Sequence, residues 1–155
     1  MEAKKCVGIT VNGDKLNLVS VQFSHRNSPP AVLDDLTLKL QAGNRPQSYN
    51  AMYERVRNYL RENDIECVAI KESAASKNSG LSHLLAAELR GVVIAACQST
   101  VLDVLTVKKA TISRTFGQRK VDDYVADDSF WESNLVGELR KGSREAALVV
   151  IAAKG

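Results

Sequence analysis

The segment VAIKESAASKNSG, residues 68–80, carries a short apolar run into two charged residues, Lys71 and Glu72, and then into a loop of small residues. Residues 66–70 have the length and apolar character of a buried strand. From residue 81 onward apolar side chains recur at spacings of three and four, which predicts a long helix up to residue 97. The charged pair therefore falls where a strand ends and its connecting loop begins. In α/β folds this edge of a sheet is where ligands usually bind.

Upstream of this segment the chain predicts a three-stranded meander. Residues 5–11 and 15–22 are rich in β-forming residues, and Asn-Gly-Asp at positions 12–14 separates them. Asn and Gly tolerate the positive φ of a tight turn, so the two runs are expected to form a hairpin. Residues 31–40 are expected to form the third strand.

Helices and two further strands are predicted after the meander. Ser48 is a candidate N-cap for a helix that ends near Asn63, and this helix leads into the strand at 66–70 by a crossover that favours parallel pairing. The remaining predicted elements are a strand at 101–107, a short basic helix at 108–117, an acidic and aromatic segment at 121–131 and an apolar helix at 143–153.

This order predicts an α/β protein of the RNase H-like fold, with a five-stranded mixed sheet and helices on both faces. Three strands form the antiparallel meander and two add in parallel. A chain of 155 residues suits one core, so residues 1–155 are expected to form a single domain. Gly91, inside the long predicted helix, suggests that another element packs closely there.

Composition limits the classes of function. The 45% hydrophobic and 25% charged residues are typical of a globular protein, and the net charge of +3 permits an anionic partner without requiring one. Cys6, Cys67 and Cys97 lie among apolar residues without a CxxC pattern, so we expect core thiols in a reducing cytoplasm. We find no signal-peptide pattern and no run near the ~20 apolar residues of a membrane span. A soluble, cytoplasmic protein without a membrane partner is expected.

Two stretches resemble a known family. AIKESAASKNSGLSHLLAAELRGVVIAA (69–96) and VLDVLTVKKATISRTFGQRKV (101–121) resemble the strand, loop, long helix, fifth strand and lysine-bearing segment of the RuvC-like Holliday junction resolvases, a branch of the RNase H-like superfamily. VGITVNGDKLNLVSV (7–21) and GSREAALVVIAA (142–153) match more loosely. The resemblance covers most of the chain as a pattern.

The resemblance implies an active site of four carboxylates that hold two divalent metals ~3.5 to 4 Å apart, because such hard cations need oxygen ligands. In this sequence the four positions fall on Thr10, Lys71, Gly142 and Glu145, so one carboxylate remains. A cation at Lys71 repels metal ions. The resemblance therefore implies a degenerate active site, and no cofactor is expected.

In an alternative interpretation, the protein keeps a metal-dependent nuclease activity with repositioned carboxylates. Glu72 turns inward if the strand slips by one residue or bulges, and Asp14 lies just past the first hairpin turn. Together with Glu145 these residues define a candidate single-metal site. A DNA or RNA endonuclease of this kind requires Mg²⁺ or Mn²⁺.

The basic segment predicts nucleic-acid binding. Its cations occur without an intervening acidic residue, and Lys71 and Arg90 extend the same candidate surface; the cations of the segment are Lys108, Lys109, Arg114, Arg119 and Lys120. Clustered cations bind phosphates through counterion release without reading sequence. The alternative is a solvated helix face balanced by the acidic residues that follow. Aromatic residues near Trp131 either stack on bases or pack onto the body or onto a second subunit.

Two further expectations concern partners. The long helix at 81–97 carries a wide apolar stripe, and the resemblance implies a homodimer. A third possible function is a non-catalytic oligomeric scaffold or accessory protein, which predicts a protein partner and no affinity for nucleic acid.

Overall fold

The computed structural model describes residues 3–75, 77 and 80–154, and it has the predicted five-stranded mixed sheet in the order β3-β2-β1-β4-β5. The first three strands are antiparallel, and the last two add in parallel to β1. The strands are β1 (Lys4–Asn12), β2 (Lys15–Phe23), β3 (Ala31–Lys39), β4 (Cys67–Lys71) and β5 (Asp103–Val107). This is the predicted RNase H-like α/β architecture.

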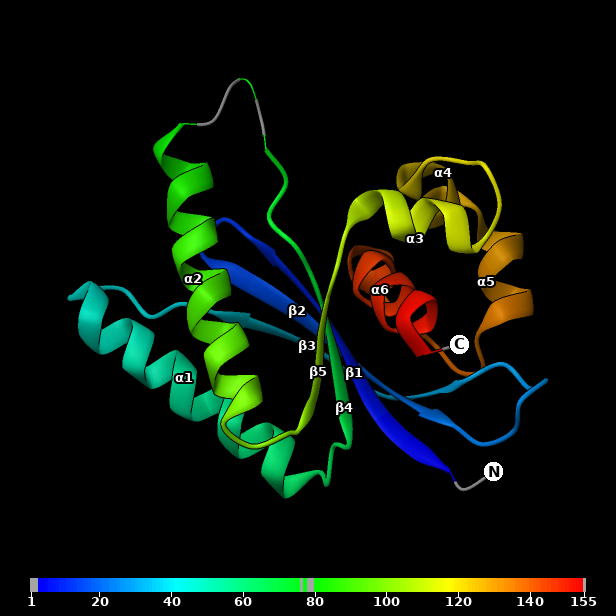
Figure 1. Cartoon of the computed structure of the whole chain (residues 1–155), viewed down its shortest axis with the longest axis horizontal. Coiled ribbons are helices and arrows are strands. Elements are labelled where there is room, and N and C mark those ends of the chain that lie inside the picture. The colour runs from blue at the N-terminus through cyan, green and yellow to red at the C-terminus, as the bar shows by residue number, and fades with distance from the viewer. Residues whose placement is uncertain (1–2, 76, 78–79, 155) are drawn as a thin grey trace.

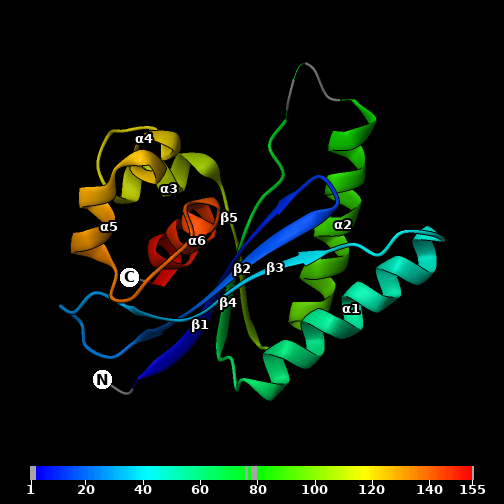
Figure 2. The same cartoon turned by 180° about the vertical axis from the view of Figure 1, so that it is seen from behind.

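Helices cover both faces of the sheet, as Figures 1 and 2 show from opposite sides. One face carries α1 (Arg45–Glu62) and α2 (Leu81–Gln98). The other carries α3 (Lys109–Thr115), α4 (Val121–Ala126), α5 (Asp128–Asn134) and α6 (Arg144–Lys154), with the 3₁₀ turn η1 (Lys141–Ser143) immediately before α6.

The alternation of side chains along β1 assigns its residues to the two faces. The odd positions Val7, Ile9 and Val11 pack with α1 and α2, whereas Cys6 packs on the α6 side. Because side chains of a strand alternate, Thr10 faces the α6 side as well. The hairpin to β2 closes at Gly13, whose φ of 62° lies in the left-handed region that a tight turn needs.

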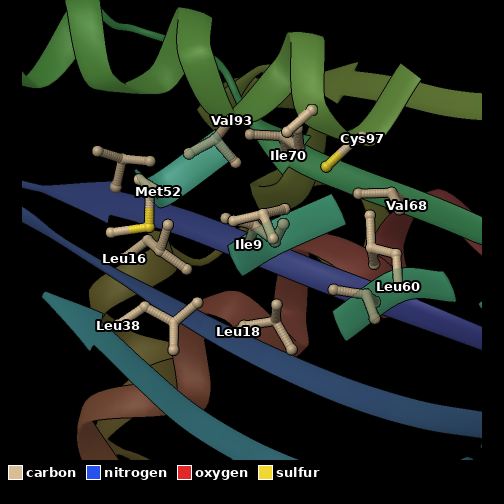
Figure 3. Packing of buried hydrophobic residues seen from close by; sticks show 14 of the residues in the cluster. Ile9, Leu16, Leu18, Leu38, Met52, Leu60, Val68, Ile70, Val93 and Cys97 are labelled. Carbon is tan, nitrogen blue, oxygen red and sulfur yellow. The ribbon is translucent and has the colours of Figure 1, made fainter. Parts of the chain in front are cut away.

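The first core lies between the sheet and the helices α1 and α2 (Figure 3). Ile9 and Ile70 come from adjacent parallel strands, and Leu60 and Val93 reach them from the two helices. All four are at most 1% exposed. Burying such a side chain stabilises the fold by roughly 1.5 to 3 kcal/mol.

The second core is built around α6. This helix is buried along most of its length because the sheet lies on one side and the short helices α3 and α4 pack on the other. Its approach to β1 is possible because residue 8 is glycine: a Cβ there would lie 2.0 Å from the backbone oxygen of Ala146. The aromatic segment packs into this layer, with Trp131 6% exposed and its Nε1 donating a hydrogen bond of 2.9 Å to the Tyr124 carbonyl. The rings of Tyr124 and Trp131 are thus packed onto the body of the protein and are not free to stack on bases.

Two local predictions are wrong. Asn44, not Ser48, caps α1: its side chain accepts a hydrogen bond from the Gln47 backbone, and the helix starts three residues before Ser48. Ser48 instead donates to the Asn44 carbonyl from within the first turn. Gly91 has no close neighbour, because a Cβ there would meet nothing within 4 Å in the described structure.

The prediction of three core thiols is wrong for two of them. Cys6 and Cys67 are directly opposite in the parallel pairing of β1 and β4, and they form a disulfide. This parallel register brings together residues that are 61 positions apart in the sequence. Cys97 is a free buried cysteine, as predicted, and burial raises the pKa of its thiol to about 12.

The long helix α2 meets a criterion that no segment was expected to meet from the sequence. By length and apolar composition alone it is sufficient to cross a membrane. In the structure its buried side chains, among them Leu89 and Val93, pack in the first core. A core helix satisfies the same criteria of length and composition.

Candidate functional site

The predicted site lies at the edge of the sheet where β1 and β4 end. The two strands pair up to Ile9 and Ile70, and Thr10 and Lys71 are the next residues of each. Because the paired isoleucines face α1 and α2, Thr10 and Lys71 face α6. Thr10 is 6% exposed, and Lys71 is the last residue of β4.

Glu145 reaches the same place from the first turn of α6. Lys71 Nζ donates a hydrogen bond to Glu145 Oε1 at 2.9 Å, and the two side chains are 20% and 28% exposed. Because the pair is partly buried, solvent and salt screen the attraction between its charges less than in a surface ion pair. The structure therefore joins two of the four predicted active-site positions by an ion pair.

Gly142, the remaining one of the four predicted active-site positions, lies in η1 and takes part in the site through its backbone carbonyl. Its carbonyl accepts a hydrogen bond of 3.1 Å from Asn17 Nδ2, and Asn17 Oδ1 accepts one of 2.8 Å from Thr37 Oγ1. Asn17 pairs with Thr10 across the β1–β2 ladder. A Cβ at Gly142 would meet no atom of the described residues within 4 Å, so contacts with them do not explain the glycine.

A second cluster of polar side chains lies where the chain enters α6. Arg140 donates to both carboxylate oxygens of Asp35 on β3, at 2.8 and 3.1 Å, and Ser143 Oγ donates to Asp35 as well. Burial raises the pKa of the Asp35 carboxyl, but the hydrogen bonds from Arg140 and Ser143 outweigh it, and the net pKa is below the usual value. These contacts hold the start of α6 against the edge strand β3.

The donor set at the four positions does not fit the two-metal centre that the resemblance implies. It consists of a threonine hydroxyl, an ammonium group, a glycine and a single carboxylate, and the ammonium already binds that carboxylate. Among the residues that the structure describes, no group of three or more His, Cys, Asp or Glu side chains is arranged to hold a metal ion.

The carboxylates of the alternative site lie apart from one another. Glu72 lines a cavity of about 420 Å³ beside Val107 and Lys108, and its backbone N–H donates to the Val107 carbonyl at 2.9 Å. Asp14 lines a different groove with Arg45. Glu145 lines neither of them and points to Lys71.

Arg90, predicted to contact nucleic acid, turns inward. Its Nη2 donates to the Val11 carbonyl at 3.0 Å and its Nη1 donates to Ser73 Oγ. The side chain is half-buried, and desolvation lowers the pKa of its guanidinium. Arg90 thus ties α2 to the end of β1.

The basic segment divides into paired and exposed cations. Arg119 Nη1 binds Asp127 Oδ2 at 2.9 Å, and the guanidinium lies over the Tyr124 ring. Hydrogen bonds from Ser129 and Arg119 lower the pKa of Asp127 to about 2. Four cations of the segment are exposed, and none has an acidic partner within 4 Å in the described part of the chain: Lys108, Lys109, Arg114 and Lys120.

The basic segment starts beside the ion pair. Val107 pairs with Lys71 in the β4–β5 ladder, so Lys108 follows directly at the same edge of the sheet. From there α3 runs over the α6 side (Figure 1).

Sequence reasoning missed the contacts of Asn17, Thr37 and Arg140. The period-2 pattern of β2 and β3 does place Asn17 and Thr37 on polar positions. Their pairing depends on a register shift beside Ser20, which no sequence pattern marks.

Solved structures of Holliday junction resolvases share this fold. Thermus thermophilus RuvC matches with a TM-score of 0.70 and 14% identity over 96% of this chain and 92% of that one. The same protein in complex with a Holliday junction substrate matches equally well, over 91% of its chain.

A eukaryotic structure shares the fold. The yeast mitochondrial Holliday junction resolvase Ydc2 matches with a TM-score of 0.65 and 10% identity over 96% of this chain and 77% of that one. No family model matches the sequence, and no curated protein matches it significantly. At these identities the comparisons show the fold.

Proposed function

We propose that this protein binds nucleic acid and has lost the two-metal cleavage chemistry of RuvC-like resolvases. The observation that carries the proposal is the ion pair between Lys71 and Glu145 at two of the positions where the resemblance implies metal-binding carboxylates. The ammonium neutralises the one carboxylate of the set and repels a divalent cation. Without the metals, the attacking and leaving oxygens of phosphodiester cleavage lack their stabilising charges.

Binding is supported by the exposed cations beside this site. Lys108, Lys109 and Arg114 lie on or directly before α3, next to the sheet edge that carries the ion pair. Exposed cations gain affinity for a phosphate backbone by releasing counterions, and they retain that ability without a metal site. The RuvC structure with a bound Holliday junction supports a branched nucleic acid as the ligand.

A binding titration over a range of salt concentrations tests the proposal. Fluorescence anisotropy would follow labelled four-way junction, duplex and single-stranded DNA. The variant Lys109→Gln/Arg114→Gln removes two exposed cations from α3. Its matched control, Lys4→Gln/Arg55→Gln, removes one lysine and one arginine that are also exposed, at the far end of β1 and on α1.

We expect the α3 variant to bind duplex more weakly and to flatten the slope of log K against log salt by about 1.8, since each phosphate contact contributes about 0.9. The control should keep the slope of the wild-type protein. Salt-independent binding, or equal slopes for the two variants, would contradict the proposal.

We also propose the homodimer that the resemblance implies. Its support is the exposure of Leu81 and Leu84, 69% and 57%, on the outer side of α2. Light scattering at micromolar concentration tests it, with a dimer mass expected and a monomer mass contradicting it. A protein that is dimeric but shows no affinity for any nucleic acid would instead support the scaffold or accessory function.

A further inference from the structure

A pair of lysines faces solvent on the other flank of the candidate site. Lys15 of β2 and Lys39 of β3 are direct partners across the antiparallel ladder, and both are exposed. The Leu40 backbone N–H donates to the Asp14 carbonyl at 2.7 Å, so the neighbouring pair is hydrogen-bonded. Because such pairs alternate, Lys15 and Lys39 occupy a non-hydrogen-bonded pair, in which the two Cα atoms approach to ~4.5 Å.

The lysines share a face with the candidate site. Leu16 and Leu38, their neighbours in the two strands, pack in the first core, so Lys15 and Lys39 project on the α6 side. The next pair on this face is Asn17 and Thr37, which are joined by a hydrogen bond. This hydrogen bond confirms that side chains meet across the two strands here.

Neither lysine forms an ion pair with any residue that the structure describes. Of the acidic residues at this end of the sheet, Asp35 binds Arg140 and Glu145 binds Lys71, whereas Asp14 and Glu72 form no ion pair with a described residue. Like charges directly opposite each other in a ladder are unfavourable. An anion between the two ammonium groups converts this repulsion into attraction, and a phosphate group has the charge and acceptor oxygens to do so.

The two flanks lie at the same end of the sheet but are offset by two residues along the strands, because Lys15 pairs with Asn12 of β1 whereas Lys71 is level with Thr10. In the order β3-β2-β1-β4-β5, Lys39 and Lys15 stand at one side, Lys71 follows on β4, and Lys108 follows β5 at the other side. Five strands at ~4.8 Å spacing span roughly 19 Å. At ~3.4 Å per nucleotide along one strand of a duplex, this distance corresponds to about five or six nucleotides.

We propose that Lys15 and Lys39 form a phosphate clamp for a nucleic-acid backbone, so that a bound strand crosses the sheet edge from β3 to α3. The clamp rests on the proposed function, because it assumes that nucleic acid is the ligand. It extends the binding surface to residues outside the basic segment.

The test compares four proteins by anisotropy on the same labelled junction and duplex: wild type, Lys15→Gln/Lys39→Gln, Lys15→Arg/Lys39→Arg, and the control Lys4→Gln/Arg55→Gln. Circular dichroism melting checks that all are folded. Each lost phosphate contact should lower duplex affinity about eightfold at 0.1 M salt and flatten the salt slope by about 0.9. The arginine variant should bind like wild type.

The outcomes separate the clamp from the proposed function. If wild type binds and the glutamine variant matches the control, the clamp is wrong and the proposed function stands. If wild type shows no salt-dependent binding, both are wrong. Loss of binding in the arginine variant also overturns the clamp, because the charges remain in place there.

Discussion

Gly8 is the position where one methyl group should disturb both the fold and the candidate site. A Cβ at this position would lie 2.0 Å from the Ala146 oxygen and 3.0 Å from the Val150 Cβ. The first atom belongs to the backbone of α6 and cannot rotate away. Gly8→Ala therefore forces α6 away from β1, and Glu145, one residue before Ala146, moves with the helix.

The magnitude follows from the overlap. An ordinary contact begins at 3.4 Å, so the 2.0 Å separation is 1.4 Å too short. Overpacking of a core costs about 1 to 3 kcal/mol, and more where backbone must shift. We expect Gly8→Ala to lower the free energy of unfolding by about 3 kcal/mol or more. For a chain of this size this loss lowers Tm by roughly 6 to 12 °C.

Gly91→Ala is the matched control, because the same change in the middle of α2 meets no atom within 4 Å among the residues that the structure describes. Alanine favours a helix over glycine by roughly 0.5 to 1 kcal/mol, so this variant should melt slightly above wild type. Thermal unfolding followed by circular dichroism measures both. A Gly8→Ala protein that melts at the wild-type temperature would refute the packing of α6 on β1 described above.

Three further predictions concern stability. A double-mutant cycle of Lys71→Met and Glu145→Gln in urea unfolding should give a coupling energy of about 1 to 2 kcal/mol, and a value near zero would mean that the ion pair is absent in solution. The disulfide between β1 and β4 closes a 61-residue separation, so Cys6→Ser or reduction should cost about 4 kcal/mol. Thiol titration of the unreduced, denatured protein should find one free thiol, and three would exclude the disulfide. Asp35 has a lowered pKa, so its contacts with Arg140 stabilise the fold above its ordinary pKa and are lost as pH falls through the lower, folded-state value. Asp35→Asn should therefore destabilise the protein at neutral pH, with a difference that shrinks as the pH falls below the ordinary pKa of an aspartate; a constant difference would contradict this.

Local patterns were sufficient to predict the order of the five strands and of α1, α2, α3 and α6, but they predicted neither α4 nor α5. β1 is a run of β-forming residues that is buried on both faces, as suits a central strand, and the apolar positions of α2 recur with a helical period, so its apolar face is buried. The crossover through α1 favours parallel pairing of β4, and β4 does pair in parallel with β1.

Registers between distant strands could not be predicted. The shift beside Ser20 decides that Lys15 meets Lys39, and the parallel offset of β1 and β4 decides that Cys6 meets Cys67. A single residue of slip would exchange the faces of a strand, and no local propensity depends on it. The close approach of α6 to Gly8 could not be predicted either, because Ala146 lies on a helix that follows more than 130 residues later.

The most direct test of the central claim reads binding and cleavage from the same samples. Purified protein would be incubated with labelled junction, flap, single-stranded and duplex substrates, with and without Mg²⁺ or Mn²⁺, and run on native and denaturing gels. The proposed function predicts retardation that weakens with salt while every substrate stays intact. Metal-dependent cutting that disappears in Glu145→Gln would contradict it and would favour the single-metal site with Glu72 and Asp14.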